Sequence, residues 1–146
     1  MTKSDFKNPR AKHDFVGRTC SISAVGSYVP QKVLTNADLE TLVDTSNEWI
    51  LSRTGIHERR IAAANEFTSD MAAKAAMVAL NRAEVNPNDV DLIILATITP
   101  DMPFPATACL VQQKIEAFNA AAFDIEAACS GFVYALEIGQ QPRSTT

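Results

Sequence analysis

The residues with the clearest chemical potential lie in the stretch 123–132, FDIEAACSGF, which contains Cys129. A cysteine thiolate is a good nucleophile for acyl transfer, but most free cysteines are small hydrophobes in a packed core. Small residues on both sides would let a substrate approach the sulfur closely: Ala127, Ala128, Ser130 and Gly131. From these residues alone two interpretations stay open, a nucleophile and a cysteine that fills the core.

The elements around Cys129 are predicted to place it at a strand-to-helix turn. Residues 121–126 alternate as a short strand, and residues 130–140 carry apolar side chains at helical spacing. Cys129 would then lie at the N-terminus of a helix. Unpaired backbone N–H groups and the positive end of the helix dipole stabilise a thiolate there and can donate to an oxyanion. The position therefore favours the nucleophile.

The composition limits the class of protein. A length of 146 residues suits one domain, and 47% hydrophobic with 21% charged residues is ordinary for a globular chain. A formal net charge of -4 argues against nucleic acid as a partner. The apolar runs, such as LIILA, are too short to cross a bilayer, and the charged first residues lack the apolar core of a signal peptide. We therefore expect no membrane partner.

The cysteines and histidines do not form a metal or disulfide pattern. Cys20, Cys109 and Cys129 share no CxxC spacing, so we expect neither a disulfide framework nor a zinc site. This cysteine usage fits a reducing cytoplasm. His13 and His57 lie far apart in the sequence, so no metal site is predicted. The sequence has no GxGxxG or GxxxxGK loop of the kind that binds phosphates.

The N-terminal part of the chain predicts short elements. Residues 20–25 alternate as a strand, and residues 35–38 resemble the start of a helix before LETLV. Residues 45–48 form a capping box, which opens a short helix that ends near Gly55. We interpret residues 57–67, HERRIAAANEF, as a solvated and charged loop.

The C-terminal part predicts alternating helices and strands. The alanine-rich residues 69–82 predict a helix, and residues 91–97 predict a strand buried on both faces. A loop rich in proline, TPDMPFPATAC, then leads into a helix through Cys109, Val111 and Ile115. Together with the strand and helix around Cys129, this order implies βαβ units. It indicates an α/β fold with a mostly parallel sheet covered by helices.

Four blocks of the sequence occur in the same order in a known family: SYVPQKVLTNADLE, DTSNEWILSRTGIHERRIAA, FPATACLVQQKI and AFDIEAACSGFVYAL. They closely resemble the N-terminal half of β-ketoacyl-acyl-carrier-protein synthase III, a thiolase-like condensing enzyme. The resemblance implies the N-terminal half of a thiolase-like fold at residues 19–140. We expect a flexible leader at residues 1–18 and, at residues 141–146, a tail outside the family, with the second half missing.

The resemblance also implies a reaction and its site. In the family a cysteine takes an acyl group, usually acetyl, from acyl-coenzyme A, and the thioester then accepts the carbanion made by decarboxylating malonyl-acyl-carrier protein. Cys129 matches this cysteine, while Thr45, Trp49 and Arg53 match positions that contact coenzyme A. Coenzyme A is a substrate, so no permanently bound cofactor is expected. The parent enzyme would be a cytoplasmic homodimer that initiates fatty acid synthesis.

Some residues keep an alternative, purely structural interpretation. Trp49 could anchor its helix and Arg53 could lie along the surface, and without the family these would be the favoured interpretations. Phe104 matches a position that the family uses at the dimer interface and acyl pocket, or it packs in the core.

The function has two candidates because the family's catalytic histidine and asparagine belong to its second half. Neither His13 nor His57 matches that histidine. The first candidate is the N-terminal half of an acyltransferase, inactive in condensation as this 146-residue chain alone. The alternative is a catalytically dead remnant, or a module that binds coenzyme A or acyl groups without condensing them.

Overall fold

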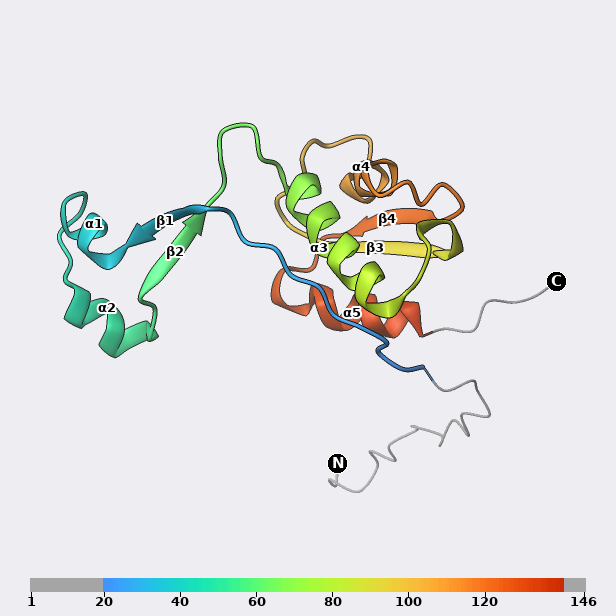
Figure 1. Ribbon diagram of the computed structural model, residues 1–146. Helices are drawn as coiled ribbons and strands as arrows, with labels where there is room; N and C mark the ends of the chain where they lie inside the picture. Colours follow the sequence, from blue (N-terminus) through green and yellow to red (C-terminus); the bar gives the residue numbers. More distant parts are fainter. Residues whose placement is uncertain (1–19, 141–146) are drawn as a thin grey trace, which may run out of the picture.

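The computed structural model describes residues 20–140 (Figure 1). The expected leader at residues 1–18 and the expected tail at residues 141–146 lie outside the described residues. Within residues 20–140, the closely packed pairs of elements fall into two groups. We call residues 32–61 the lobe and residues 68–140 the sheet body.

The lobe contains a strand pair and two short helices. Its elements are β1 (Lys32–Thr35), α1 (Asn36–Glu40), α2 (Asn47–Thr54) and β2 (Glu58–Ile61). The Thr35 hydroxyl accepts a hydrogen bond from the Asp38 N–H, and the Asp38 carboxylate accepts one from the Thr35 N–H, which starts α1 as the sequence predicts. Helix α2 ends at Gly55, whose φ of 68° suits glycine.

The cap of α2 differs slightly from the prediction. Ser46, not Thr45, is the N-cap residue, and its hydroxyl accepts a hydrogen bond from the Trp49 N–H at 3.1 Å. Thr45 therefore lies just before the helix, where its side chain is free of the capping role.

The interpretation of residues 57–67 as a loop is wrong for Glu58–Ile61. These residues form β2, which pairs antiparallel with β1 in a register that places Lys32 opposite Ile61. The charged stretch ERRI has no alternation that would predict a strand. Backbone hydrogen bonds to residues more than twenty positions earlier hold it extended, and local sequence cannot show such a pairing.

The sheet body is built from a parallel strand pair and three helices. Its elements are α3 (Thr68–Ala83), β3 (Leu92–Ala96), α4 (Thr107–Lys114), β4 (Ala121–Ile125) and α5 (Gly131–Gly139), with short 3-10 turns at Pro87–Asp89 and Ala128–Ser130. Strands β3 and β4 are parallel, with α4 between them in sequence. In Figure 1, α3 and α4 lie on one side of this pair and α5 lies on the other. This confirms the expected mixed α/β fold with βαβ character.

The core of the sheet body lies under α3 and α4. It is formed by small and branched residues from α3, α4 and the loop after α4: Ala73, Val111, Ile115, Ala117 and Ala120. Strand β3 is only half-buried, so the expectation of burial on both faces is met in part. Strand β3 packs against α4 and α5, and much of the apolar surface of α5 is itself exposed.

The strand predicted at residues 20–25 does not form. No ladder pairs these residues within the described part of the chain, and alternation alone cannot make a strand without a partner. The segment instead approaches α3. The Arg82 guanidinium donates to the Val25 carbonyl at 2.8 Å, and a Cβ on Gly26 would lie 2.1 Å from the Ala75 carbonyl oxygen. Glycine at position 26 is what permits this contact.

Candidate functional site

Cys129 lies in the turn between β4 and α5, as the sequence predicts. Strand β4 ends at Ile125, a 3-10 turn spans Ala128–Ser130, and α5 begins at Gly131. The Cys129 side chain is exposed. The interpretation of Cys129 as a core-filling residue is therefore wrong, because the thiol is not packed among the described residues.

The backbone around Cys129 is bent sharply. Ala128 has a positive φ of 44°, which an alanine adopts at a cost in free energy. Gly131 is buried, and a Cβ there would lie 3.0 Å from the Ala96 Cβ. Glycine thus lets α5 begin close to the end of β3. The turn places Cys129 beyond the carboxyl ends of two parallel strands, where α/β folds commonly bind ligands.

The start of α5 favours a negative charge through the helix dipole, whose positive end lies there. Ser130, the N-cap residue, makes no side-chain capping hydrogen bond. The Ser130 and Gly131 N–H groups donate within the 3-10 turn, to the carbonyls of Ala127 and Ala128. The dipole can stabilise a thiolate and an oxyanion formed beside it. The catalytic role of Cys129 remains a prediction.

We expect Cys129 to be the fastest of the three thiols to react with iodoacetamide near neutral pH. Cys109 is half-buried, with its sulfur 3.8 Å from the Ala122 carbonyl oxygen. Cys20 is exposed, so access alone does not separate it from Cys129, and the difference must come from the helix N-terminus. Peptide mapping after brief labelling of the folded chain measures the three rates. Equal labelling of Cys20 and Cys129 would contradict the activation of Cys129.

The residues expected to contact coenzyme A lie at and after the start of α2. Thr45 and Trp49 line one pocket together with Asp44 and Ser46. The Trp49 side chain is 58% exposed, which argues against a role as a helix anchor. Arg53 is exposed one turn further along, and the i to i+4 spacing puts it on the face of α2 that carries Trp49. The structure thus brings these three residues to one surface of the lobe.

Cys129 does not share that surface. It belongs to the sheet body, and the pocket of Thr45 and Trp49 does not include it. Figure 1 shows α2 in the lobe, well separated from α5 in this view. Any site that uses both sets of residues therefore depends on how the lobe is held relative to the sheet body.

Phe104 lies in the loop that leads into α4. Its side chain is 87% exposed, so the alternative that it packs in the core of this chain is wrong. It lines a second pocket with Met102, Cys109 and Phe123. A role at a dimer interface or acyl pocket remains a prediction.

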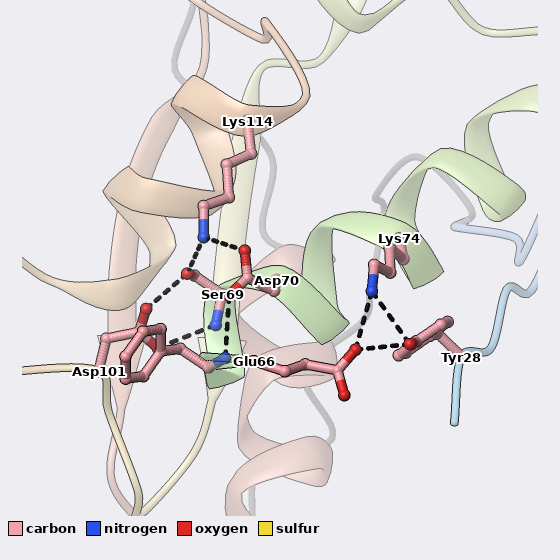
Figure 2. A network of polar contacts seen from close by, with 8 residues as sticks. Tyr28, Glu66, Ser69, Asp70, Lys74, Asp101 and Lys114 are labelled. Atoms are coloured by element: carbon pink, nitrogen blue, oxygen red, sulfur yellow. Dashed lines mark hydrogen bonds and ion pairs between the residues drawn. The ribbon is translucent and has the colours of Figure 1, made fainter. Parts of the chain in front are cut away.

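Two aspartates that sequence analysis missed organise this region. The Asp124 carboxylate accepts hydrogen bonds from the backbone N–H groups of Thr107 at 2.6 Å and Ala108 at 2.7 Å, and so caps α4. The Asp101 carboxylate accepts from the Ser69 backbone N–H at 2.9 Å and from its hydroxyl, at the start of α3 (Figure 2). An aspartate inside the apolar strand AAFDI is the sequence signal, since a half-buried carboxylate needs partners.

Ion pairs tie the start of α3 to its neighbours. Lys114 Nζ lies 2.6 Å from the Asp70 carboxylate, and this hydrogen bond is the main reason that the pKa of Asp70 lies below its usual value. Lys74 pairs with Glu66 at 2.8 Å, and Tyr28 joins them (Figure 2).

Residues 20–140 contain neither a membrane-spanning helix nor a metal-binding cluster. No helix there is long and apolar enough to cross a membrane. No group of three or more His, Cys, Asp or Glu side chains there is arranged to hold a metal ion.

Comparison with known proteins shows which proteins this chain is similar to. No protein-family model matches the chain. A β-ketoacyl-[acyl-carrier-protein] synthase III from Caldanaerobacter subterraneus is 59% identical over 120 residues, which cover 82% of this chain and 36% of that protein. The crystal structure of 3-oxoacyl-[acyl-carrier-protein] synthase III from Aquifex aeolicus matches with a TM-score of 0.78 and 58% identity over 81% of this chain. The chain is homologous to the N-terminal part of the β-ketoacyl-acyl-carrier-protein synthases III.

Two further proteins are similar to the chain over the same part. The enzyme from Symbiobacterium thermophilum is 56% identical over 128 residues, which cover 88% of this chain and 39% of that protein. The priming β-ketosynthase of the R1128 polyketide pathway matches with a TM-score of 0.78 and 38% identity over 82% of this chain. The chain therefore spans well under half the length of these synthases, and it has their thiolase-like fold over the part that it covers.

Proposed function

We propose that this chain supplies the acyl-accepting cysteine of a synthase III-type acyltransferase, with Cys129 as the nucleophile. One observation carries the proposal: the exposed Cys129 thiol sits at the N-terminus of α5 in a chain that is 59% identical to a synthase III. A thiol so placed has the access and the electrostatic setting that nucleophilic catalysis requires.

The first half-reaction transfers an acetyl group. The Cys129 thiolate attacks the carbonyl carbon of acetyl-coenzyme A, and the carbonyl electrons move onto the oxygen. The positive end of the α5 dipole would stabilise that oxyanion. The intermediate then collapses, the bond to the coenzyme sulfur breaks, and coenzyme A leaves as a thiolate that takes a proton from solvent. Acetyl-Cys129 remains.

The second half-reaction would condense acetyl-Cys129 with malonyl-acyl-carrier protein and so initiate fatty acid synthesis. The relatives are named for the acyl-carrier protein, which makes it the proposed protein partner. The histidine and asparagine expected for decarboxylation would come from the part of a synthase III that this chain does not span. We propose a cytoplasmic homodimer for the complete enzyme, with coenzyme A thioesters as substrates and no permanently bound cofactor.

The surface of the lobe is the proposed binding site for the adenine end of coenzyme A. The exposed Trp49 ring can stack on adenine, the Arg53 guanidinium can pair with phosphate, and Thr45 lies beside Trp49 in the pocket. The exposure of Trp49 supports this assignment, since an aromatic ring left open to solvent is available to a ligand.

The proposal is tested by the mass of the chain after incubation with acetyl-coenzyme A. We expect one acetyl adduct, located on the peptide that contains Cys129, that hydroxylamine removes as a thioester. A folded chain that acquires no adduct on Cys129 would refute the proposed half-reaction.

Binding of coenzyme A is expected to change the fluorescence of Trp49. Trp49 is the single tryptophan of the sequence, so the signal has one source. Arg53→Ala should weaken the affinity by about tenfold, because a charged hydrogen bond to phosphate is worth roughly 1.5–3 kcal/mol. Arg82→Ala, on α3 of the sheet body, is the matched control and should leave the affinity unchanged. An equal affinity in the wild type and Arg53→Ala would show that Arg53 does not bind coenzyme A.

The second candidate is a module that binds coenzyme A or acyl groups without condensing them. The pocket of Thr45 and Trp49 favours it, because this pocket does not include Cys129. A chain that binds coenzyme A through Trp49 but leaves Cys129 unmodified would select this second function.

A further inference from the structure

The two halves of the proposed site lie on parts of the chain that are joined by two linkers. The first linker, residues 25–31, leads into β1, and the second, residues 62–67, leads from β2 into α3. The closely packed element pairs in residues 20–140 lie within the lobe or within the sheet body. The position of the lobe relative to Cys129 therefore depends on the two linkers and on their contacts.

Both linkers meet in one polar cluster on α3. The Tyr28 hydroxyl, from the first linker, donates to the carboxylate of Glu66, from the second, at 2.5 Å. Lys74, on α3, donates from Nζ to Glu66 at 2.8 Å and to the Tyr28 hydroxyl at 3.0 Å. Lys74 Nζ also lies 4.2 Å from the centre of the Tyr28 ring. Figure 2 shows the three side chains pointing toward one another.

The cluster lies beside an open pocket. A pocket lies between the two linkers and α3, and its lining includes Tyr28, Ala63, Glu66 and Lys74. The linkers are thus not packed tightly against α3 by apolar side chains at this place. The Glu66 side chain is only 13% exposed, so its hydrogen bonds are partly shielded from water. Lys74, and then Tyr28, hold the pKa of the Glu66 carboxyl below its usual value, so it accepts both bonds as a carboxylate.

Further contacts flank the cluster, one on the side of the lobe and the others toward the far end of α3. Toward the lobe, the Arg60 guanidinium of β2 donates to the Pro30 carbonyl at 3.5 Å and joins β2 to the first linker. Toward the far end of α3, Arg82 holds the Val25 carbonyl, and Gly26 lies against Ala75. The cluster is therefore the point where the first linker, the second linker and the sheet body are joined at once.

We propose that Tyr28, Glu66 and Lys74 are positioning residues that hold the coenzyme-binding surface of the lobe in a fixed place relative to Cys129. The inference rests on the proposed function, in which the adenine end binds the lobe while the thioester reaches Cys129. One coenzyme molecule can contact both sites only if the distance between them is maintained. Loss of the cluster would leave each site intact and would uncouple them.

The test compares two acetyl donors on the full 146-residue chain. Acetyl-coenzyme A can use both the lobe and Cys129, whereas S-acetyl-N-acetylcysteamine lacks the nucleotide and can use Cys129 alone. In Lys74→Met and Tyr28→Phe we expect the ratio of their Cys129 acylation rates to fall by about tenfold, with the rate for the short donor unchanged. Lys74→Arg, which keeps a charged donor, should restore much of the ratio.

Lys114→Met is the matched control. It removes an ion pair to α3 of similar length, between Lys114 and Asp70, but both partners belong to the sheet body. It should lower the unfolding temperature and leave the ratio as in the wild type. An unchanged ratio in folded Lys74→Met and Tyr28→Phe, or an equal fall in Lys114→Met, would overturn the positioning role.

A second readout separates this inference from the proposed function. Time-resolved anisotropy of Trp49, measured without ligand, should gain a faster component in Lys74→Met and not in Lys114→Met, because the lobe moves more freely. If neither donor acylates wild-type Cys129, the proposed function fails and the anisotropy alone decides on the cluster. Identical anisotropy decays in the wild type and Lys74→Met would refute the positioning role whatever the acylation shows.

Discussion

Cys129→Ala is expected to lower the rate of acetyl transfer from acetyl-coenzyme A to the protein by at least about a thousandfold, since removing a nucleophile removes the whole covalent path. The exposed sulfur at the start of α5 has no substitute among the described cysteines that combines exposure with a helix N-terminus. Intact-mass time courses under one set of conditions measure this loss.

Two matched variants make the result specific. Cys20→Ala removes the other exposed thiol, and Cys109→Ala removes the half-buried one, so each should be acetylated at the wild-type rate. The circular dichroism spectrum of Cys129→Ala should match that of the wild type, because an exposed side chain contributes little to packing. Equal acetylation of Cys129→Ala and the wild type would show that the acyl group goes elsewhere.

The second large effect concerns condensation. We expect this chain alone to give no malonyl-dependent product above the rate without enzyme. Decarboxylation builds negative charge on the malonyl thioester, and donors aimed at that oxygen are worth several kcal/mol in the transition state. We propose that those donors belong to the part of a synthase III that this chain does not span. Measurable turnover by the purified chain would show that residues 1–146 hold a complete condensing site.

The same chain should associate through α5. Helix α5 leaves a row of large apolar side chains exposed by 41–65%: Phe132, Val133, Tyr134, Leu136 and Ile138. An apolar patch of this kind favours association or a covering partner. Sizing chromatography should therefore show species larger than the monomer.

Two substitutions test whether α5 is responsible. Phe132→Ser with Leu136→Ser should increase the monomer fraction, whereas Leu42→Ser, at a residue that is 68% exposed in the lobe, should not. A chain that runs as a monomer at high concentration without these changes would contradict the prediction. Adding the C-terminal part of a synthase III as a second polypeptide should compete with self-association.

Local signals in the sequence were enough to predict several elements of the fold. The hydroxyl and carboxyl groups of Thr35 and Asp38 start α1, Gly55 ends α2, and alanine-rich helical periodicity defines α3. Each of these signals involves residues that are close together in the sequence, so one continuous stretch is enough to predict the element. The turn that carries Cys129 belongs to the same class, since a strand, small residues and an apolar helix follow one another directly.

Other features were decided by contacts between residues far apart in the sequence. The stretch ERRI became β2 because β1 supplies its hydrogen bonds, while residues 20–25 found no such partner among the described residues. The cluster of Tyr28, Glu66 and Lys74 joins positions that no local pattern connects. By itself the sequence determined which residues could carry the chemistry, through residue type and local spacing. Only the tertiary structure decided how the lobe and Cys129 are placed, because that placement depends on long-range hydrogen bonds and packing.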